Sequence, residues 1–551
     1  MVSLTIDKKR WLRDLGVGDT PELLERVAQF GVEVDESTPE RLIVDITPNR
    51  PDLLSHEGFA RALSAFLDRD PGLKLYPTQP SKLKVTVDES LKGIRPATAC
   101  AIASGLQLDD GRLQEIIDIQ ERLHVTFGRR RKRCAIGVYP IDAISGNITF
   151  TAKKPEEIRF RPLESEREMT AREILTEHPK GKEFAHLLEG LPAYPVFLDA
   201  RGNVLSMPPV INSHGVGKVT TSTTEVFIEA SGHDMRACEE VVRIICCALA
   251  DMGATIKTVT VQYGKKQVVT PDLSPRKQEF YGYYVEKRLG VRIRPEQYPT
   301  LLAKMGLGHE QGRVKDTHRA IIPPYRVDFL HQVDVIEDLA IALGYEHIPA
   351  TAPSLVTIAR ESPMSRLLQV IRARLVGHGL VEAKNYHIAN KEFQARLGDA
   401  DVVTLASSVS LEHDSLRASL ITSLLGTLAI NKVHAYPQGF FEIGTAFAPA
   451  QRCVTESTRL AVALAADTGA DYTRARQVIE SALAALGLSG AFAPHDDARF
   501  LRGRCARVTV GGREVGLVGE LSPAAITAAG LAVPVAAAEI DIDVILGLLQ
   551  K

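Results

Sequence analysis

The chain has 551 residues, of which 45% are hydrophobic and 24% are charged, and its formal net charge at pH 7 is −2. This length predicts about three to five domains instead of one core, and the composition is that of a soluble globular protein. The absence of any run of about 18 apolar residues argues against a membrane protein, and the near-zero net charge excludes a protein that binds polyanions over its whole surface.

The first predicted unit covers residues 1–75. Thr20, a typical N-cap residue followed by a proline, predicts the start of an amphipathic helix. An apolar strand is predicted at residues 42–46, and a second helix is predicted to run through Phe66. Between them, two prolines bracket an Asn-Arg pair at residues 48–51. Because proline fixes φ and lacks an N–H donor, this segment predicts a rigid structural turn.

Residues 71–80 hold three prolines and a glycine, which predicts a linker. The next unit, residues 80–265, alternates predicted strands with predicted helices and is interpreted as a larger α+β domain. The predicted strands are 99–104, 134–138 and 226–229, and the predicted helices are 113–123 and 235–252.

Five consecutive cations lie within this second unit. Such a run can contact a phosphate backbone, and a solvated loop tip is an equally good alternative. The run consists of Arg129, Arg130, Arg131, Lys132 and Arg133.

Residues 215–220, Gly-Val-Gly-Lys-Val-Thr, look like the end of a phosphate-binding loop. Such a loop needs the pattern Gly-x-x-x-x-Gly-Lys followed by Ser or Thr. Asn212 and Val219 stand where the first glycine and the Ser or Thr are required. A nucleotide bound in the manner of a P-loop is therefore excluded here.

A third unit, residues 266–349, ends in a predicted acidic helix that continues to about Tyr345. Its apolar stripe consists of Ile336, Leu339, Ala340 and Leu343. Three carboxylates are predicted on the opposite side, and grouped hard oxygen ligands suit Mg²⁺. A solvated acidic face is the alternative. The candidate metal ligands are Asp328, Asp334, Glu337 and Asp338.

The remaining residues, 355–551, are interpreted as a fourth unit. The seven cysteines of the chain are scattered and none has Cys-x-x-Cys spacing. Structural zinc and a disulfide framework are therefore not expected, which is typical of a cytoplasmic protein.

Several of these motifs resemble the beta subunit of phenylalanyl-tRNA synthetase of the archaeal and eukaryotic type. The acidic helix and its flanks carry Tyr-Arg-Val-Asp at 325–328, Asp-Val-Ile-Glu-Asp at 334–338 and Gly-Tyr-Glu-His-Ile-Pro at 344–349. The Pro-Asn-Arg-Pro-Asp turn at 48–52 matches as well, and the resemblance covers essentially the whole chain. It implies that the acidic residues hold magnesium near the contact with an alpha subunit.

The resemblance also implies that the second unit is an editing domain that hydrolyses tyrosine mischarged onto the phenylalanine tRNA. An apolar pocket rejects an added hydroxyl poorly, so a second, polar pocket is needed. The matching segments are 128–137, 207–213 and 224–234. The editing candidates are His124, Asn212, Ser213, Glu229, Ser231 and Asp234.

Segments 416–425, 440–447 and 511–523 resemble a class II synthetase fold. A working class II site needs a glycine-rich strand that ends in a phosphate-clamping arginine, and residues 440–551 contain none. This chain alone is therefore not expected to activate an amino acid, and ATP would be used at the alpha subunit.

The resemblance thus implies a multidomain α+β chain: an N-terminal α/β unit, an editing domain, a small acidic-helix module and a class II synthetase-like fold without catalytic residues. Its expected partners are the alpha subunit, in an alpha2beta2 tetramer, and the tRNA for phenylalanine. Two alternatives stay open, a free-standing trans-editing hydrolase and a scaffold subunit whose editing site is inactive. The fourth unit argues against the first alternative, because a free hydrolase does not need it.

Overall fold

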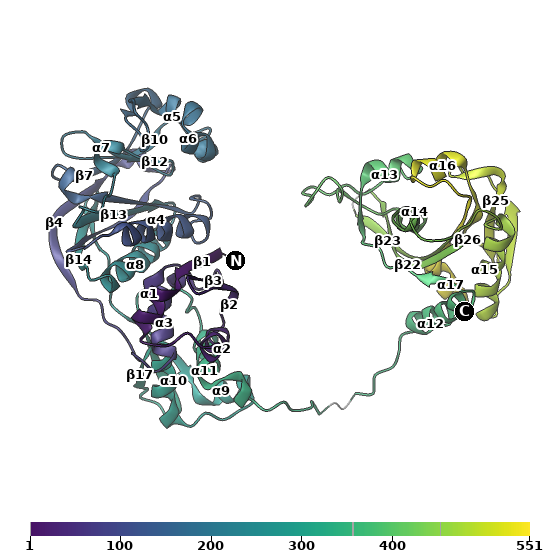
Figure 1. The fold of residues 1–551 in the computed structure, drawn as a ribbon, viewed down its shortest axis with the longest axis horizontal. Coiled ribbons are helices and arrows are strands. Elements are labelled where there is room, and N and C mark those ends of the chain that lie inside the picture. The colour runs from purple at the N-terminus through teal and green to yellow at the C-terminus, as the bar shows by residue number, and fades with distance from the viewer. Residues whose placement is uncertain (1, 355–356, 452, 551) are drawn as a thin grey trace. The chain divides into compact units, whose positions relative to one another are not determined.

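The structure is a computed structural model that describes residues 2–354, 357–451 and 453–550. The chain divides into two compact units, Met1–Ala352 and Pro353–Lys551 (Figure 1). Both combine helices with sheets, which confirms the predicted multidomain α+β class. None of the helices in the described ranges is long and apolar enough to cross a membrane.

The N-terminal part of the first unit is a three-stranded antiparallel sheet with three helices. The strand order is β1 (Val2–Asp7), β3 (Arg41–Ile46), β2 (Glu33–Ser37). The helices are α1 (Lys8–Leu15), α2 (Pro21–Gln29) and α3 (His56–Phe66). Thr20 caps α2 through its side chain, as predicted. In the predicted turn, the buried side chains of Arg50 and Asp52 form an ion pair of 2.9 Å.

A ten-stranded sheet forms the middle of the first unit. Its path is β12-β11-β10-β7-β4-β14-β5-β13-β6, and β15 pairs with β14. The strands are β4 (Thr78–Val87), β5 (Ala97–Ser104), β6 (Cys134–Pro140), β7 (Ile148–Lys153), β10 (Tyr194–Leu198), β11 (Val204–Met207), β12 (Ile211–Asn212), β13 (Glu225–Gly232), β14 (Thr255–Tyr263) and β15 (Lys266–Thr270). The predicted strands at 99–104, 134–138 and 226–229 are confirmed as β5, β6 and β13. Each predicted end lies within three residues of the observed one.

Two long helices pack on one face of this sheet, α4 (Asp110–Val125) and α8 (Met235–Asp251). They confirm the helices predicted at 113–123 and 235–252. At the β12 end of the sheet, a smaller apolar core is built around two short helices and a two-stranded ribbon. These elements are β8 (Arg159–Phe160), β9 (Met169–Thr170), α5 (Ala171–Glu177) and α6 (Pro179–Phe184). The short helix α7 (His214–Gly217) packs into a separate core through Val216.

The last part of the first unit is a second three-stranded sheet with three helices. The strand order is β16 (Arg276–Tyr281), β18 (Thr317–Ile322), β17 (Gly308–Gln311), and the helices are α9 (Gly282–Leu289), α10 (Tyr298–Lys304) and α11 (Gln332–Leu343). The acidic helix α11 ends at Leu343, two residues before the predicted end near Tyr345, and the segment before Gln332, which holds Asp328, is not helical. One continuous apolar core joins this module to α8 and to α3.

The second unit is a seven-stranded sheet with helices on both faces (Figure 1). Its order is β19 (Val381–Glu382), β22 (Gln438–Pro449), β23 (Val454–Ala465), β27 (Val535–Asp541), β26 (Arg513–Leu521), β25 (Phe500–Val510), β24 (Gly490–Pro494). One face packs against α12 (Pro363–Gly377), α15 (Tyr472–Ala485) and α17 (Ile542–Leu549), and the other against α14 (Leu420–Asn431) and α16 (Pro523–Ala528). A short ribbon, β20 (Ile388–Ala389) with β21 (Ser415–Leu416), and α13 (Lys391–Arg396) complete the unit.

Candidate functional site

A cavity of about 460 Å³ opens in the first unit between α4, β6 and the β12–α7 segment. Its inner wall is apolar, and its polar lining includes Glu121, His124, Asn212, His214 and Lys218. A recess of about 20 Å³ adjoins it, because His124 and Asn212 line both spaces. A recess of that size holds one water molecule or one hydroxyl group.

Glu229 of β13 borders this recess. Its side chain is buried, and the Tyr139 hydroxyl donates a hydrogen bond of 3.0 Å to Oε1. Tyr139 also lies 2.8 Å from Ser206 Oγ, which fixes the phenol ring from a second side. Oε2 of Glu229 is buried without a hydrogen-bond partner. A buried acceptor left in this state requires an explanation, and a ligand that donates a hydrogen bond in the recess would provide one.

Gly137 of β6 faces Glu229 across the strand pair. A Cβ atom at this position would overlap the Tyr139 hydroxyl and stand 2.7 Å from Glu229 Oε1. Only glycine therefore leaves room for the carboxylate and the phenol to meet. This explains the glycine of the Ala-Ile-Gly element at 135–137.

The buried carboxyl of Glu229 makes stability depend on pH. Burial raises the pKa of Glu229 from 4.5 to about 7. Because the folded-state pKa lies above the unfolded one, the full stability is present below about pH 4.5 and part of it is lost as the pH rises through 7. A shift of this size corresponds to about 3 kcal/mol.

Glu229→Gln removes the titrating group and keeps its shape. The free energy of unfolding of the variant relative to the wild type should therefore increase by about 3 kcal/mol between acidic and alkaline pH. Urea unfolding of the full chain at about pH 4.5 and about pH 8 measures this difference. An equal difference at both pH values would contradict a buried, titrating Glu229.

The structure brings three of the six editing candidates together at the cavity: His124, Asn212 and Glu229. His124 uses both ring nitrogens, since Nε2 accepts from the Ile136 N–H at 2.8 Å and Nδ1 lies 3.3 Å from Glu121 Oε1. Burial lowers the pKa of His124. The ring is therefore held neutral as part of the wall.

The other three candidates make structural contacts outside the cavity lining. Ser213 caps α7, and Asp234 caps α8 by accepting from the Arg236 N–H at 3.0 Å. Ser231 lies two residues beyond Glu229 on β13 and accepts from Arg95 Nε at 3.2 Å.

The arginine run is not a uniformly exposed strip, contrary to the expectation. Arg131 is buried, donates to the Pro209 and Val210 carbonyls at 3.2 and 2.8 Å, and pairs with Glu121 at 2.8 Å. Arg133 is half-buried and lies 3.5 Å from Asp234. The exposed cations of the run are Arg129, Arg130 and Lys132.

The acidic helix also differs from the expectation. The spacing predicts Asp338 opposite the apolar stripe, but its side chain is only 4% exposed and pairs with the buried Arg326 at 3.0 Å. Asp328 binds the same guanidinium at 2.8 Å. Asp334 caps the helix by accepting from two backbone N–H groups, and Glu337 accepts from the Tyr345 hydroxyl at 3.1 Å.

No group of three potential ligands converges anywhere in the part of the chain that the structure describes. The four acidic residues therefore do not fit a shared ion in this arrangement, because a cation of the protein already occupies the space between Asp328 and Asp338.

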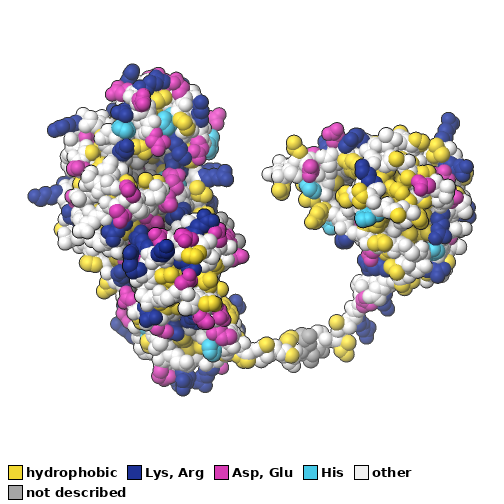
Figure 2. Space-filling model, in the orientation of Figure 1, with side chains coloured by type: hydrophobic (Ala, Val, Ile, Leu, Met, Phe, Trp, Pro, Cys, Tyr) yellow, Lys and Arg dark blue, Asp and Glu magenta, His cyan; other side chains and the backbone are white. Residues whose placement is uncertain are grey.

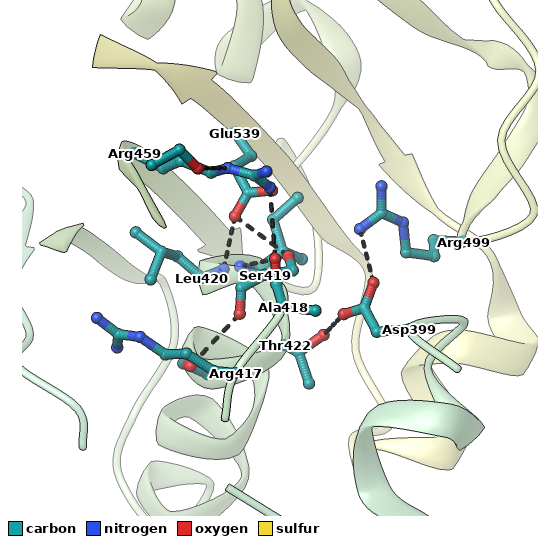
Figure 3. A network of polar contacts seen from close by, with 12 residues as sticks. Asp399, Arg417, Ala418, Ser419, Leu420, Thr422, Arg459, Arg499 and Glu539 are labelled. Atoms are coloured by element: carbon teal, nitrogen blue, oxygen red, sulfur yellow. Dashed lines mark hydrogen bonds and ion pairs between the residues drawn. The ribbon is translucent and has the colours of Figure 1, made fainter. Parts of the chain in front are cut away.

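The second unit has a cavity of about 390 Å³ lined by Arg459, Arg499 and Glu539. Glu539 accepts from Arg459 at 3.0 Å and from the Leu420 N–H at the start of α14 at 2.5 Å, as Figure 3 shows. Arg499 pairs with Asp399 at 3.4 Å. These charges neutralise one another and hold α14 against β27, so the cavity offers no free cation like the phosphate clamp of a class II site.

Three family models match the chain. Residues 1–69 match the "Phe-tRNA synthetase beta subunit B1 domain", residues 280–345 the "tRNA synthetase B5 domain" and residues 348–542 the "Phenylalanyl tRNA synthetase beta chain CLM domain".

Similar curated proteins include the phenylalanine–tRNA ligase beta subunits of Pyrococcus abyssi, 38% identical over 89% of each chain, and of Archaeoglobus fulgidus, 34% identical over 95% of each chain. Among solved structures, an N-terminal fragment of the phenylalanyl-tRNA synthetase beta subunit from Pyrococcus horikoshii is 36% identical, with a TM-score of 0.59 over 62% of this chain and 99% of the fragment.

Proposed function

We propose a function from one premise: the chain belongs to the family of phenylalanine–tRNA ligase beta subunits. Together with an alpha subunit it supports the ATP-dependent attachment of phenylalanine to its tRNA. The complex is a cytoplasmic alpha2beta2 tetramer in which the alpha subunit uses ATP and magnesium. The isolated beta chain does not activate the amino acid; this part of the proposal is supported by the cavity of the second unit, where both lining arginines, Arg459 and Arg499, are already paired with carboxylates.

We further propose that the chain itself hydrolyses mischarged Tyr-tRNA. The observation that carries this proposal is the unpartnered Oε2 of Glu229 beside a recess of one-hydroxyl size. A tyrosine side chain in the cavity would donate its phenolic O–H to this carboxylate, which is a charge-assisted bond. Phenylalanine would leave the buried carboxylate unpaired, so the site discriminates against it.

The chemistry of the step is simple. Water adds to the ester carbonyl, the bond to the terminal ribose oxygen breaks, and that oxygen leaves with a proton. Such an activated ester needs mainly a held geometry and one hydrogen-bonding group. Asn212 lines both the cavity and the recess and is half-buried, so it is the candidate that orients the ester or the water.

A deacylation assay with the co-expressed alpha and beta subunits tests this function directly. Tyr-tRNA should be cleared and Phe-tRNA spared, by a selectivity of about 10⁴ in the most favourable case. Clearance of neither would leave the scaffold alternative, and equal clearance of both would contradict recognition of the tyrosine hydroxyl.

We assign the domains from this function. Residues 1–75 form the N-terminal domain and 355–551 the synthetase-like domain. The predicted boundary between residues 265 and 266 moves to 270/271, because β15 (Lys266–Thr270) pairs with β14. Residues 80–270 then form the editing domain and 271–349 the acidic-helix module. Magnesium at Asp328, Asp334, Glu337 and Asp338 stays a prediction of the family resemblance. It would require Arg326 to release two of these carboxylates.

The alpha subunit, we propose, covers an apolar surface of the second unit. Figure 2 shows hydrophobic side chains gathered on the visible face of this unit. The most exposed large ones within residues 381–433 are Tyr386, Val409, Leu411, Ile430 and Val433, each at least 79% exposed. An exposed apolar cluster of this kind marks an interaction surface. Tyr386 contacts His413, which places Tyr386 beside the segment that carries Val409 and Leu411.

Leu411→Asp should prevent copurification of the alpha subunit without unfolding the chain, because Leu411 is 85% exposed. Val314→Asp in the first unit is the matched control, since Val314 is 69% exposed and lies outside this surface. Size-exclusion chromatography of the co-expressed subunits measures the result. Copurification at the wild-type level by Leu411→Asp would place the alpha subunit elsewhere.

A further inference from the structure

Arg95 is a buried cation that lies just before β5 in the proposed editing domain. The residue is only 4% exposed. Its guanidinium binds uncharged acceptors, because Nε donates to Ser231 Oγ at 3.2 Å and Nη2 donates to the Ser231 carbonyl at 2.6 Å and to the Arg131 carbonyl at 3.4 Å. Within the described residues Arg95 pairs with no carboxylate, whereas Arg131 and Arg133 each pair with one. A buried cation without a counter-charge is costly, so its presence requires an explanation.

Ser231 links Arg95 to Glu229. Residues two apart in a strand point to the same side, so Ser231 and Glu229 share one face of β13. The Ser231 hydroxyl accepts its hydrogen bond from Arg95 and still has a proton to donate. Burial lowers the pKa of Arg95, and Glu229 is the carboxylate that acts against this fall. The buried cation and the buried carboxylate therefore lie within range of each other's charge, with Ser231 as their shared neighbour.

The other titratable groups around the buried carboxylate supply no free positive charge. Burial raises the pKa of the Tyr139 hydroxyl and of the Cys100 thiol, so both stay neutral. Burial lowers the pKa of His124, which lines the recess and is neutral as well. Arg131 also lines the recess, but its charge is paired with a carboxylate of α4. Of the cations described near this carboxylate, Arg95 is therefore the one without a partner.

The charge of Glu229 is balanced near neutral pH. Burial raises its pKa to about 7, while Tyr139, Arg95 and Ser231 act against the rise. The loss of one of these opposing contributions would move the pKa above 7 and leave the carboxyl mostly protonated at neutral pH. A protonated carboxyl carries a hydrogen of its own and is no longer an acceptor-only group. It would then no longer demand a donor from the ligand, which is the basis of the proposed selection for tyrosine.

We propose that Arg95 is a positioning residue of the editing site: bound to Ser231, it places a positive charge beside Glu229, so that the tyrosine hydroxyl meets a carboxylate. This inference rests on the proposed editing function and explains why the fold keeps a buried arginine that has no ion-pair partner. Arg95 lines neither the cavity nor the recess, so it acts through Glu229 and not on the substrate itself.

The pH at which Glu229 titrates tests the inference without any substrate. Urea unfolding of the full chain, with and without Glu229→Gln, from about pH 5 to about pH 9.5, gives this pH as the point where the difference in stability changes. In Arg95→Met the titration should move up by about one pH unit, because a cation that favours the ionised form is lost. The stability that is lost as the pH rises through the folded-state pKa of Glu229 is then lost at a higher pH than in the wild type.

Three further variants separate the charge of Arg95 from its structural contacts. Arg95→Lys keeps the charge and should titrate within about 0.3 pH unit of the wild type. Ser231→Ala keeps the cation but removes the link, and should raise the titration by about half a unit. Arg122→Met is the matched control, since the Arg122 side chain is 14% exposed, pairs with Asp118 and donates to the Leu54 carbonyl. It should destabilise the chain but leave the titration of Glu229 at the wild-type pH.

Deacylation by the co-expressed ligase gives a second readout. Hydrolysis of Tyr-tRNA relative to Phe-tRNA should rise with pH as Glu229 ionises, and in Arg95→Met it should be about fivefold slower at about pH 7, with the wild-type profile restored in Arg95→Lys. If the wild-type ligase hydrolyses no Tyr-tRNA, the proposed function fails, and the titration of Glu229 still decides whether Arg95 sets its charge.

An unchanged titration of Glu229 in Arg95→Met would overturn the inference. Should that variant not fold, an unchanged titration in Ser231→Ala would overturn it instead. An equal shift in Arg122→Met would overturn it as well, because loss of stability alone would then account for the effect.

Discussion

Replacing Glu229 by Ala in the assembled ligase should slow the clearance of Tyr-tRNA by about 100-fold or more, while phenylalanine charging proceeds as in the wild type. A buried carboxylate that accepts the tyrosine hydroxyl is the group that the recess offers, and a hydrogen bond to a charged partner contributes about 1.5–3 kcal/mol. Glu229→Gln should lose less, about tenfold, because the amide keeps the shape and hydrogen-bonding capacity but not the charge. Single-turnover deacylation of Tyr-tRNA measures both variants.

Glu225→Ala is the matched control for this experiment. Glu225 lies on the same strand as Glu229, pairs with Lys257 at 2.8 Å and lies outside the editing cavity. It should clear Tyr-tRNA at the wild-type rate. Normal clearance by Glu229→Ala would place the recognition of the hydroxyl at another polar group. Normal clearance after Glu229 and Asn212 are both replaced would mean that this chain does not edit.

The sequence predicts the strands and helices around this site, but it does not predict the side-chain contacts within the site. Strand and helix periodicity locate β5, β6, β13, α4 and α8, and family motifs single out Glu229. The sequence does not identify Tyr139 as a residue of the site. Tyr139 lies in a strand that is buried along its whole length, so no alternation of polar and apolar residues distinguishes it. Nothing in its spacing shows that its hydroxyl meets Glu229 from the neighbouring strand.

The arginine run and the acidic helix show the same limit. A run of charged residues predicts that all its side chains are exposed to solvent. Arg129, Arg130 and Arg131 instead adopt positive φ angles of 51°, 51° and 65°, and in this left-handed turn the side chain of Arg131 is buried. On the acidic helix, residue spacing identifies only the positions of the carboxylates. It does not predict that Asp338 is buried by pairing with Arg326, which lies in the irregular segment before the helix.

Arg326→Met should destabilise the first unit by about 3–5 kcal/mol, which is the usual cost of leaving a buried charge without its partner. Arg326 is 1% exposed and is the ion-pair partner of both Asp328 and Asp338. Burial raises the pKa of Asp338 even with the cation present, so this carboxylate is the more costly of the two to leave alone. Urea unfolding of the full chain measures the loss, and Glu337→Ala, which removes an exposed carboxylate, should change stability by less than about 0.5 kcal/mol.

The same variant decides between an internal ion pair and a magnesium site. If Arg326 alone neutralises the carboxylates, adding Asp338→Asn should restore part of the lost stability, because it removes a charge that has no partner, and millimolar magnesium should have no effect. If the carboxylates instead gather an ion once the guanidinium is gone, magnesium should stabilise Arg326→Met and Asp338→Asn should abolish that gain, since a ligand is lost. The close packing of Arg326 between both aspartates favours the first outcome, and stabilisation by magnesium would restore the metal site that the family resemblance implies.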